Sequence, residues 1–196
     1  MSSSGWQHVK RSARASRLSR SIWRVVLREP APSDAVEVNP WLSEALAAVA
    51  GRSLGEAAPL TLAQLTESLS PLQRLLLITS REAERSATGT NRPLGLIKLS
   101  NISLEPVRID ALAIAGAERN LGYGAEAVYE LEELYPNVRL IAGVPVTNGL
   151  AIYFWLRVGY RPLFPVSADI ALSPGRVWME RGALPSKSVP NPLASS

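Results

Sequence analysis

A glycine turn between a strand-like run and a helix-like segment constrains this chain more than any other feature. The turn spans residues 119–124, with the sequence Arg-Asn-Leu-Gly-Tyr-Gly; it follows the largely apolar run 109–114 and precedes the amphipathic segment 125–135. A strand, a tight turn and a helix start are therefore predicted. A helix start offers free backbone N–H groups and the positive end of the helix dipole, and glycines let the backbone approach an anion closely. The stretch thus predicts a phosphate-binding loop.

The residue types present narrow the possible chemistry. The chain has 196 residues, of which 46% are hydrophobic, which is enough for one domain with a substantial core. It contains no cysteine, and its single histidine, His8, precedes any predicted core element. A disulfide, a Ser-His-Asp triad and a cysteine- or histidine-bound metal are therefore not expected. No apolar run approaches the about 20 residues of a membrane-spanning helix, so no membrane span is expected either.

The positive charge of the chain, +4 in total, is concentrated at its N-terminus. Residues 1–28 carry seven basic side chains and no acidic one, which leaves 14 basic against 17 acidic side chains, or −3, for the remainder. Residues 1–21, rich in serine and arginine, are predicted to form a flexible basic arm. The same composition also fits an organelle transit peptide, or an arm that contacts nucleic acid or an anionic membrane. A secretory signal is not expected, because no sufficiently long apolar segment follows the charges.

Hydrophobic periodicity and turn residues predict the order of the elements. Asn39 is expected to cap the first helix, with Pro40 in its first turn and Gly51 at its end, and Thr61 with Gln64 has capping-box spacing for the second. Strands are predicted at 22–27, 75–79, 94–104, 108–114, 138–146, 160–166 and 176–181, and helices at 39–51, 62–70, 125–135 and 148–158.

The connections between these elements predict the fold class. The second to fourth strands follow one another directly, which predicts an antiparallel meander. The fourth and fifth strands are joined through the helix at 125–135, so they are expected to run parallel. The prediction is an α/β fold with a mixed, mostly antiparallel sheet of six or seven strands, flanked by helices, in a domain spanning 22–183. Residues 184–196, rich in proline and serine, are predicted to be a disordered tail.

Two short motifs resemble a known family. The first reads LAIAGAERNLGYG at 112–124, and the second reads NGLAIYFWLRVGY at 148–160. Their order, spacing and intervening elements are similar to the GNAT superfamily of acyl-CoA-dependent N-acyltransferases. The first motif resembles that family's pyrophosphate loop, and the second resembles its closing helix, with an asparagine, an alanine three residues later and an aromatic pair. The resemblance covers about residues 22–183, and its specific part lies within 94–162.

The resemblance implies a site for acetyl-CoA as co-substrate. In such folds the fourth and fifth strands splay apart and the pantetheine arm fills the gap, so the backbone of 112–114 is expected to bind the arm and to polarise the thioester carbonyl. The loop amides would hold the pyrophosphate with Arg119 as a paired charge, unless the glycines only form a turn. Asn148 would contact the arm, or serve only as a helix N-cap. The expected cofactor-binding residues are Leu112, Ala113, Ile114, Arg119, Asn120, Leu121, Gly122, Tyr123, Gly124, Ala125 and Asn148.

A dinucleotide site is the competing interpretation of the same glycines. Gly122, Gly124 and Ala127 fit the pattern GxGxx(G/A). That fingerprint requires an acidic residue about 20 positions further on, at the end of the next strand, and the glycines themselves should follow the first strand of the fold. No acidic residue occurs between Glu133 and Asp169, and the loop follows the fourth predicted strand. A dinucleotide site is therefore not expected.

The catalytic residues depart from the family's pattern. An amine with a pKa of about 10.4 needs a base to remove its proton, and some GNAT members use a glutamate where this chain has Arg108. Asp110, on the same strand face by alternation, is the expected base or else a surface carboxylate, and Glu105 is a second candidate. The family's tyrosine acid corresponds to Trp155, whose indole N–H donates a hydrogen bond but does not release a proton. Tyr153 is the neighbouring tyrosine, about 200° round the helix.

These observations together predict an enzyme that transfers an acetyl group from acetyl-CoA directly to an amine, on a small molecule or a protein, without a metal. The alternative is a catalytically weak acyl-CoA-binding module of the same fold, which the residues at 108 and 155 favour. A third option is a nucleic-acid-associated protein that uses residues 1–28, although no base-stacking platform is evident. We expect a cytoplasmic monomer or homodimer, or import into an organelle through the basic arm. The helices at 39–70 and the loop at 86–93 are expected to shape the acceptor pocket.

Overall fold

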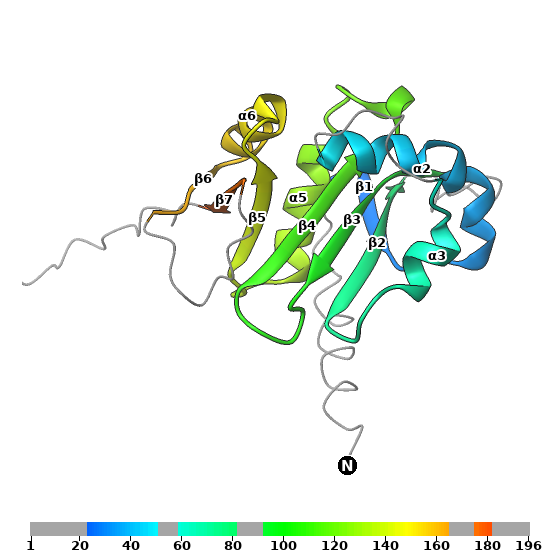
Figure 1. Ribbon diagram of the computed structural model, residues 1–196, viewed down its shortest axis with the longest axis horizontal. Helices are drawn as coiled ribbons and strands as arrows, with labels where there is room; N and C mark the ends of the chain where they lie inside the picture. Colours follow the sequence, from blue (N-terminus) through cyan, green and yellow to red (C-terminus); the bar gives the residue numbers. More distant parts are fainter. Residues whose placement is uncertain (1–22, 51–58, 82–91, 165–174, 182–196) are drawn as a thin grey trace, which may run out of the picture.

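The computed structural model describes residues 23–50, 59–81, 92–164 and 175–181 (Figure 1). The predicted arm at 1–21 and the predicted tail at 184–196 lie outside the described residues, as do Gly51 and most of the loop at 86–93. The assignments of both chain ends therefore stay predictions.

The seven described strands form one mixed sheet, as predicted. Every neighbouring pair runs antiparallel except β4 and β5, which are parallel because α5 connects them. In spatial order the strands are β1 (Val25–Arg28), β2 (Gln73–Ser80), β3 (Pro93–Ser100), β4 (Val107–Ile114), β5 (Leu140–Pro145), β7 (Arg176–Arg181) and β6 (Tyr160–Pro162). The meander β2–β3–β4 and the parallel pair are confirmed, and β7 inserts between β5 and β6.

Helices cover both faces of the sheet (Figure 1). Leu131 of α5 and Trp155 of α6 belong to the same buried cluster as one face of the strands, and Leu42 of α2 and Leu65 of α3 pack on the other face. The apolar positions of each helix recur at helical spacing, which is why each buries one stripe. The helical elements are η2 (Pro32–Asp34), α2 (Ala35–Ala50), α3 (Leu62–Glu67), η4 (Gly116–Glu118), α5 (Tyr123–Leu134) and α6 (Gly149–Arg157).

The start of α2 was predicted four residues too late. The helix begins at Ala35, directly after η2, and Pro40 lies inside it rather than in its first turn. Asn39 does not cap the helix; its side-chain oxygen accepts a hydrogen bond of 2.8 Å from the Leu62 amide at the start of α3. The Thr61 capping box of α3 is present as predicted. Asn39 thus accepts a hydrogen bond from a helix N-terminus, as predicted, but the helix is α3 and not α2.

A bidentate ion pair fixes the connection between β1 and α2. Arg28 donates to both carboxylate oxygens of Asp34, at 2.8 and 2.7 Å. These hydrogen bonds hold the pKa of the Asp34 carboxyl below its usual value. Arg28, one of the seven basic residues of 1–28, is thus engaged within the domain predicted for 22–183.

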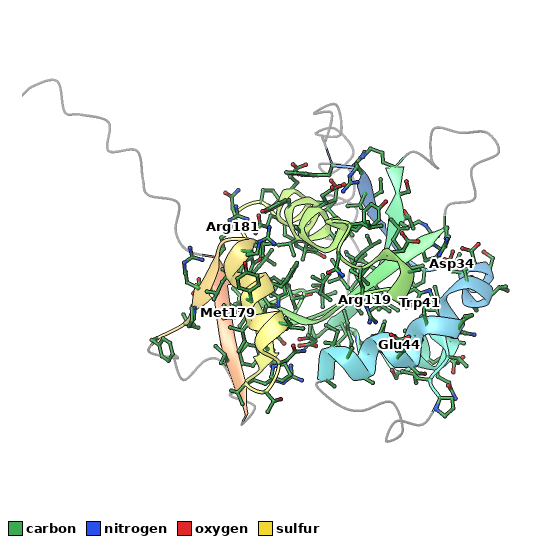
Figure 2. The ribbon with its side chains drawn as sticks, turned by 90° about the horizontal axis from the view of Figure 1, so that it is seen from above. Asp34, Trp41, Glu44, Arg119, Met179 and Arg181 are labelled. Carbon is green, nitrogen blue, oxygen red and sulfur yellow. The ribbon has the colours of Figure 1, made fainter. Side chains whose placement is uncertain are left out.

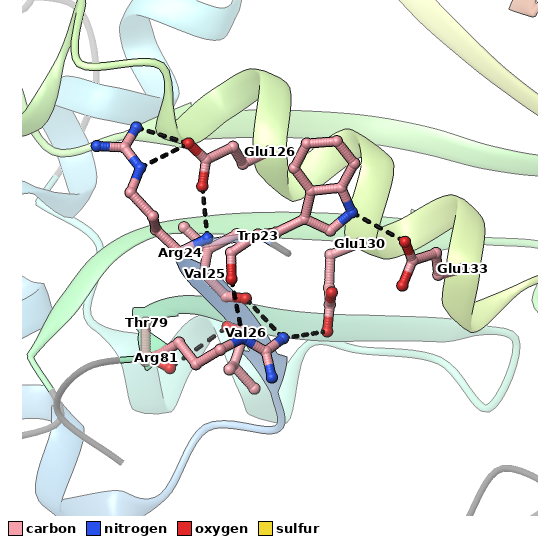
Figure 3. A network of polar contacts seen from close by, with 9 residues as sticks. All are labelled: Trp23, Arg24, Val25, Val26, Thr79, Arg81, Glu126, Glu130 and Glu133. Carbon is pink, nitrogen blue, oxygen red and sulfur yellow. Dashed lines mark hydrogen bonds and ion pairs between the residues drawn. The ribbon is translucent and has the colours of Figure 1, made fainter. Parts of the chain in front are cut away.

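A second polar network joins β1 to α5 (Figure 3). The Trp23 indole donates to Glu133, the Arg24 amide and guanidinium donate to Glu126 at 2.8 Å each, and Arg81 donates to Glu130 at 3.1 Å. Three carboxylates on one face of α5 thus bind the edge of the sheet. The network fixes the direction in which the N-terminus of α5 points.

A β-bulge interrupts β4 at Asp110. Lys98 pairs with Ala111, whereas the next residue, Leu99, pairs with Ile109, so Asp110 is the extra residue on the bulged strand. The bulge changes which side chains share a face: Ile109 and Leu112 both pack towards α5, although they are three positions apart. Strict alternation along β4, which the sequence analysis assumed, therefore fails at this residue.

The two parallel strands separate above the bulge. The register between β4 and β5 covers only three pairs, from Val107–Leu140 to Ile109–Ala142. Both strands continue past this point, β4 to Ile114 and β5 to Pro145. The splayed pair that the family resemblance implied is therefore present.

Candidate active site

A cavity of about 380 Å³ occupies the opening between β4 and β5. Its wall is formed by β4, β5, α2 and α6, together with Gly124 at the start of α5. The cavity therefore connects the α5–α6 side of the sheet with the α2 side. Its mixed wall of exposed backbone and apolar side chains suits a long, narrow ligand with a polar chain. The lining residues are Ala45, Ala48, Val49, Ile109, Asp110, Ala111, Leu112, Ala113, Ile114, Arg119, Gly124, Gly143, Val144, Pro145, Asn148, Leu150, Ala151, Phe154 and Trp155.

The backbone of β4 turns alternate peptide groups into this cavity. A Cβ on Gly95 would lie 2.4 Å from the Ala113 carbonyl oxygen, and the Ala115 amide donates to the Leu94 carbonyl, so both residues direct their backbone groups towards β3. By alternation, Leu112 and Ile114 direct theirs towards the separated β5. Of the three predicted backbone contacts, Leu112 and Ile114 are placed to bind a ligand strand, and Ala113 contributes only to the wall.

The glycine loop places free amides at the N-terminus of α5. Gly122 is the N-cap residue and has a φ of 90°, a left-handed conformation that favours glycine. Gly124 lies in the first helical turn and lines the cavity. Among the described residues, the amides of 121–124 have no hydrogen-bond acceptor, whereas the Ala125 amide donates to the Gly122 carbonyl at 3.0 Å. The loop is thus arranged to bind an anion, and Ala125 is the predicted member whose amide is already engaged.

Two arginines flank the loop. Arg24 donates to the Leu121 carbonyl at 2.8 Å and lies over the Tyr123 ring, 4.9 Å from its centroid. Arg119 donates to the Ile114 carbonyl at 3.2 Å and pairs with Glu44 of α2 at 2.9 Å; Figure 2 shows these two side chains together. The predicted pyrophosphate partner Arg119 is thus present at the site, but its charge is shared with a carboxylate.

Asn148 has two structural roles at the opposite wall. Its side-chain oxygen accepts a hydrogen bond of 3.0 Å from the Ala151 amide, which makes it the N-cap of α6. Its side-chain nitrogen donates to the Ala48 carbonyl at 3.1 Å, and the residue lines the cavity. The asparagine therefore joins α6 to α2 across the opening between the strands.

Asp110 lies at the α2 side of the cavity beside Arg108. The Arg108 Nε atom is 3.7 Å from an Asp110 carboxylate oxygen, and the Arg108 guanidinium carbon lies 4.7 Å from the centre of the Trp178 ring. Trp178 in turn covers Gly143, where a Cβ would lie only 2.9 Å from the indole. Asp110 is thus the one predicted base that lines the cavity, since Glu105 is exposed in the loop before β4.

The aromatic side chains of α6 divide between the cavity and the solvent. Trp155 is buried against Phe154 and Tyr160, with ring-centre distances of 5.3 and 4.7 Å, and both α6 rings line the cavity. Tyr153 is 60% exposed, lies beside Arg157 and does not line the cavity. We therefore remove Tyr153 from the catalytic candidates, because its side chain points away from the cavity.

Sequence reasoning missed several residues of the site. Arg24, Glu44, Ala48 and Trp178 were not singled out as site residues. The apolar stripe of α2 could have suggested a contact with the sheet, but its place beside the β4–β5 opening depends on the fold. No local sequence pattern links Trp178 to Gly143, because the two residues meet only through the pairing of β5 with β7.

Further observations limit the possible sites. A second cavity, of about 340 Å³, lies at the other end of β5, where Arg139 pairs with Glu180 and Arg181 pairs with Glu132. Burial raises the pKa of Tyr160 in its wall well above the usual value. Within the described residues, no cluster of three or more histidine, cysteine or acidic side chains is placed to bind a metal. None of the described helices is long and apolar enough to cross a membrane.

Solved acetyltransferases share this architecture. The chain is similar to the GNAT domain of S. lividans PAT, with a TM-score of 0.58, 12% identity, and coverage of 81% of this chain and 93% of that one. It is also similar to an acetyltransferase from Thermus thermophilus, with a TM-score of 0.57, 20% identity and coverage of 82% and 98%. A third similar structure is the paia N-acetyltransferase from Thermoplasma acidophilum in complex with coenzyme A, with a TM-score of 0.54, 12% identity and coverage of 80% and 98%.

No protein-family model and no curated protein matches the sequence. At these identities the similarity concerns the fold, and the chain has the fold of the GNAT acetyltransferases. The predicted fold class is confirmed.

Proposed function

We propose that this protein is an N-acetyltransferase that moves an acetyl group from acetyl-CoA to an amine. The observation that carries the proposal is the cavity between β4 and β5, which begins beside the free amides of α5 and ends at Asp110. A ligand that fills it needs an anionic group at one end and an extended polar chain, and acyl-CoA has both. The coenzyme A bound by the similar paia N-acetyltransferase supports the same choice.

In the proposed complex the pyrophosphate binds the amides of 121–124, and the pantetheine arm pairs with the backbone groups of Leu112 and with the amide of Ile114, whose carbonyl accepts from Arg119. The arm would take the place of the missing β4–β5 hydrogen bonds, so its thioester reaches the bulge at Asp110. An N–H directed at the thioester oxygen would stabilise the negative charge that develops there. Because these groups are fixed by the sheet and by α5, they need little rearrangement on binding.

The transfer itself is a direct displacement. The neutral amine nitrogen forms a bond to the thioester carbon, the carbon–sulfur bond breaks, and the sulfur leaves as a thiolate. The proton lost by the nitrogen goes to the Asp110 carboxylate, directly or through a water, and then to the thiolate. Trp155 lines the cavity, but its indole N–H does not release a proton. The thiolate can leave without a general acid, because its conjugate thiol has a reference pKa of only about 8.5.

A binding module without efficient catalysis is the second candidate. It is favoured by Trp155, which stands at the expected tyrosine acid and is packed into the core, and by Arg108, which stands at the expected glutamate base. The anion-binding loop is the same in both candidates, so cofactor binding does not separate them.

Two measurements test the proposal. Acetyl-CoA is expected to raise the melting temperature of the protein, and a panel of amines is expected to release free CoA thiol at a rate above hydrolysis. A thermal shift without amine-dependent thiol release would favour the binding module. No thermal shift at saturating acetyl-CoA would refute both candidates.

A further inference from the structure

The α2-side face of the sheet carries polar groups that the cofactor site leaves unused. Arg108, Ile141 and Trp178 lie on this face, because their neighbours Ile109, Ala142 and Met179 pack on the opposite face towards α5. Asp110 lies beside this group, because one of its carboxylate oxygens is 3.7 Å from the Arg108 Nε atom, and it also lines the cavity. Asp110 therefore meets the end of the cavity where the thioester of acetyl-CoA would arrive, and Arg108 lies directly beside it.

Two hydrogen-bond donors in this group are buried and unused. The Arg108 Nε and Trp178 Nε1 atoms are inaccessible to solvent and have no hydrogen-bond partner among the described residues. At 3.7 Å the Asp110 carboxylate is close enough to interact with the Arg108 charge but too far to accept a hydrogen bond from it. Because the Arg108 Nε is closed to solvent, an anionic oxygen of a ligand would meet the accessible part of the Arg108 side chain, 24% of its surface, and would be stabilised by the guanidinium charge.

The other charges on this face have mostly the same sign. Lys98 shares the face, because it pairs with Leu75, which packs towards α2 and α3. Arg176 donates to the Gly143 carbonyl at 2.8 Å, next to Trp178. Glu180 shares this face through its pair with Ile141, but both of its carboxylate oxygens accept hydrogen bonds from Arg139. Among the described residues that line the cavity, Asp110 is the acidic one. A second cation on the acceptor would therefore meet repulsion, whereas an anionic group would meet attraction.

We propose that the acceptor is an amino acid-like molecule, with its amine and its carboxylate on the same or adjacent carbon atoms. The inference rests on the proposed acetyl transfer and specifies the acceptor for that same site. The amine would lie at Asp110, next to the thioester, and the carboxylate would lie at the Arg108 guanidinium. Neighbouring opposite charges on the protein then match neighbouring opposite charges on the ligand, and Trp178 holds the guanidinium in place.

The test compares matched acceptors. Each amino acid of a panel is assayed beside its amide and its decarboxylated amine, with spermidine as a polycation, and kcat/KM is measured by release of CoA thiol. We expect each amino acid to exceed its decarboxylated amine at least tenfold. Arg108→Glu is expected to abolish or invert this ratio, and Arg108→Gln, which keeps the size but removes the charge, to reduce it. Arg157→Glu makes the same charge change on the solvent side of α6 and is expected to leave the ratio unchanged.

Direct binding of the same ligands to the CoA-loaded protein, measured by calorimetry, separates this inference from the proposed function. Selective binding of amino acids that Arg108→Glu removes, without thiol release, would refute acetyl transfer but support a binding site for amino acid-like ligands at Arg108. Thiol release with equal kcat/KM for amino acid and amine would support transfer and overturn the acceptor assignment. A ratio unchanged in Arg108→Glu would also overturn it, and neither release nor binding would refute both.

Discussion

Replacing Gly124 by alanine should separate the stability of the apoprotein from its ability to bind the cofactor. Gly124 is in the first turn of α5 and does not need a left-handed conformation; an added Cβ would lie 3.4 Å from Phe154 and 3.6 Å from Ile114, which is ordinary contact. A glycine-to-alanine change at such a position stabilises a protein by about 0.4–1 kcal/mol. At about 2–4 °C per kcal/mol for a chain of this size, the melting temperature of the apoprotein should rise by roughly 1–4 °C.

Cofactor binding should change in the opposite direction. The same methyl group would stand on the cavity wall at the glycine loop, where the backbone must approach the pyrophosphate closely. A ligand at 100 times its Kd stabilises a protein by about 2.7 kcal/mol, and a tenfold loss of affinity reduces this to about 1.4 kcal/mol. The thermal shift caused by acetyl-CoA should therefore fall by half or more.

The control is Gly122→Ala, read by differential scanning fluorimetry with and without acetyl-CoA. Gly122 has a φ of 90°, so alanine there should lower the stability of the apoprotein by about 1–2 kcal/mol. A Gly124→Ala protein that keeps the full thermal shift would refute the assignment of this loop to the pyrophosphate.

Three other changes test separate parts of the site and fold. Asp110→Asn should lower kcat about 10²- to 10⁴-fold with an unchanged thermal shift, and an unchanged kcat would refute its role as base. Glu44→Gln should tighten CoA binding, measured by calorimetry, by at most about fivefold, because an exposed ion pair is worth up to about 1 kcal/mol; weaker binding would contradict the competition for Arg119. Asp34→Asn should lower the free energy of urea unfolding at pH 7 but not at pH values well below about 3.9, since a lowered pKa stabilises the fold only while the carboxyl is ionised. An equal loss at both pH values would show that the ion pair with Arg28 is not the cause.

The local features of the site were readable from the sequence. Two glycines after a strand-like run predicted the turn at the start of α5, and Gly122 indeed adopts a φ of 90°. The helix between two strands required those strands to be parallel, and Asn148 was correctly read as an N-cap. Each of these inferences depends on dihedral preferences, capping or chain connection, which act over a few residues.

What only the tertiary structure decided depends on register and on contacts between distant segments. The bulge at Asp110 arises from the pairing of β4 with β3, so period-two alternation could not reveal it. Glu44 reaches Arg119 because α2 crosses the sheet beside the opening, and Trp178 reaches Arg108 because β7 pairs with β5. The sequence alone therefore determined that a glycine turn and a helix N-terminus follow the fourth strand. The packing of the sheet decided which charges face the acceptor, because side chains far apart in the chain meet only once the strand order and register are fixed.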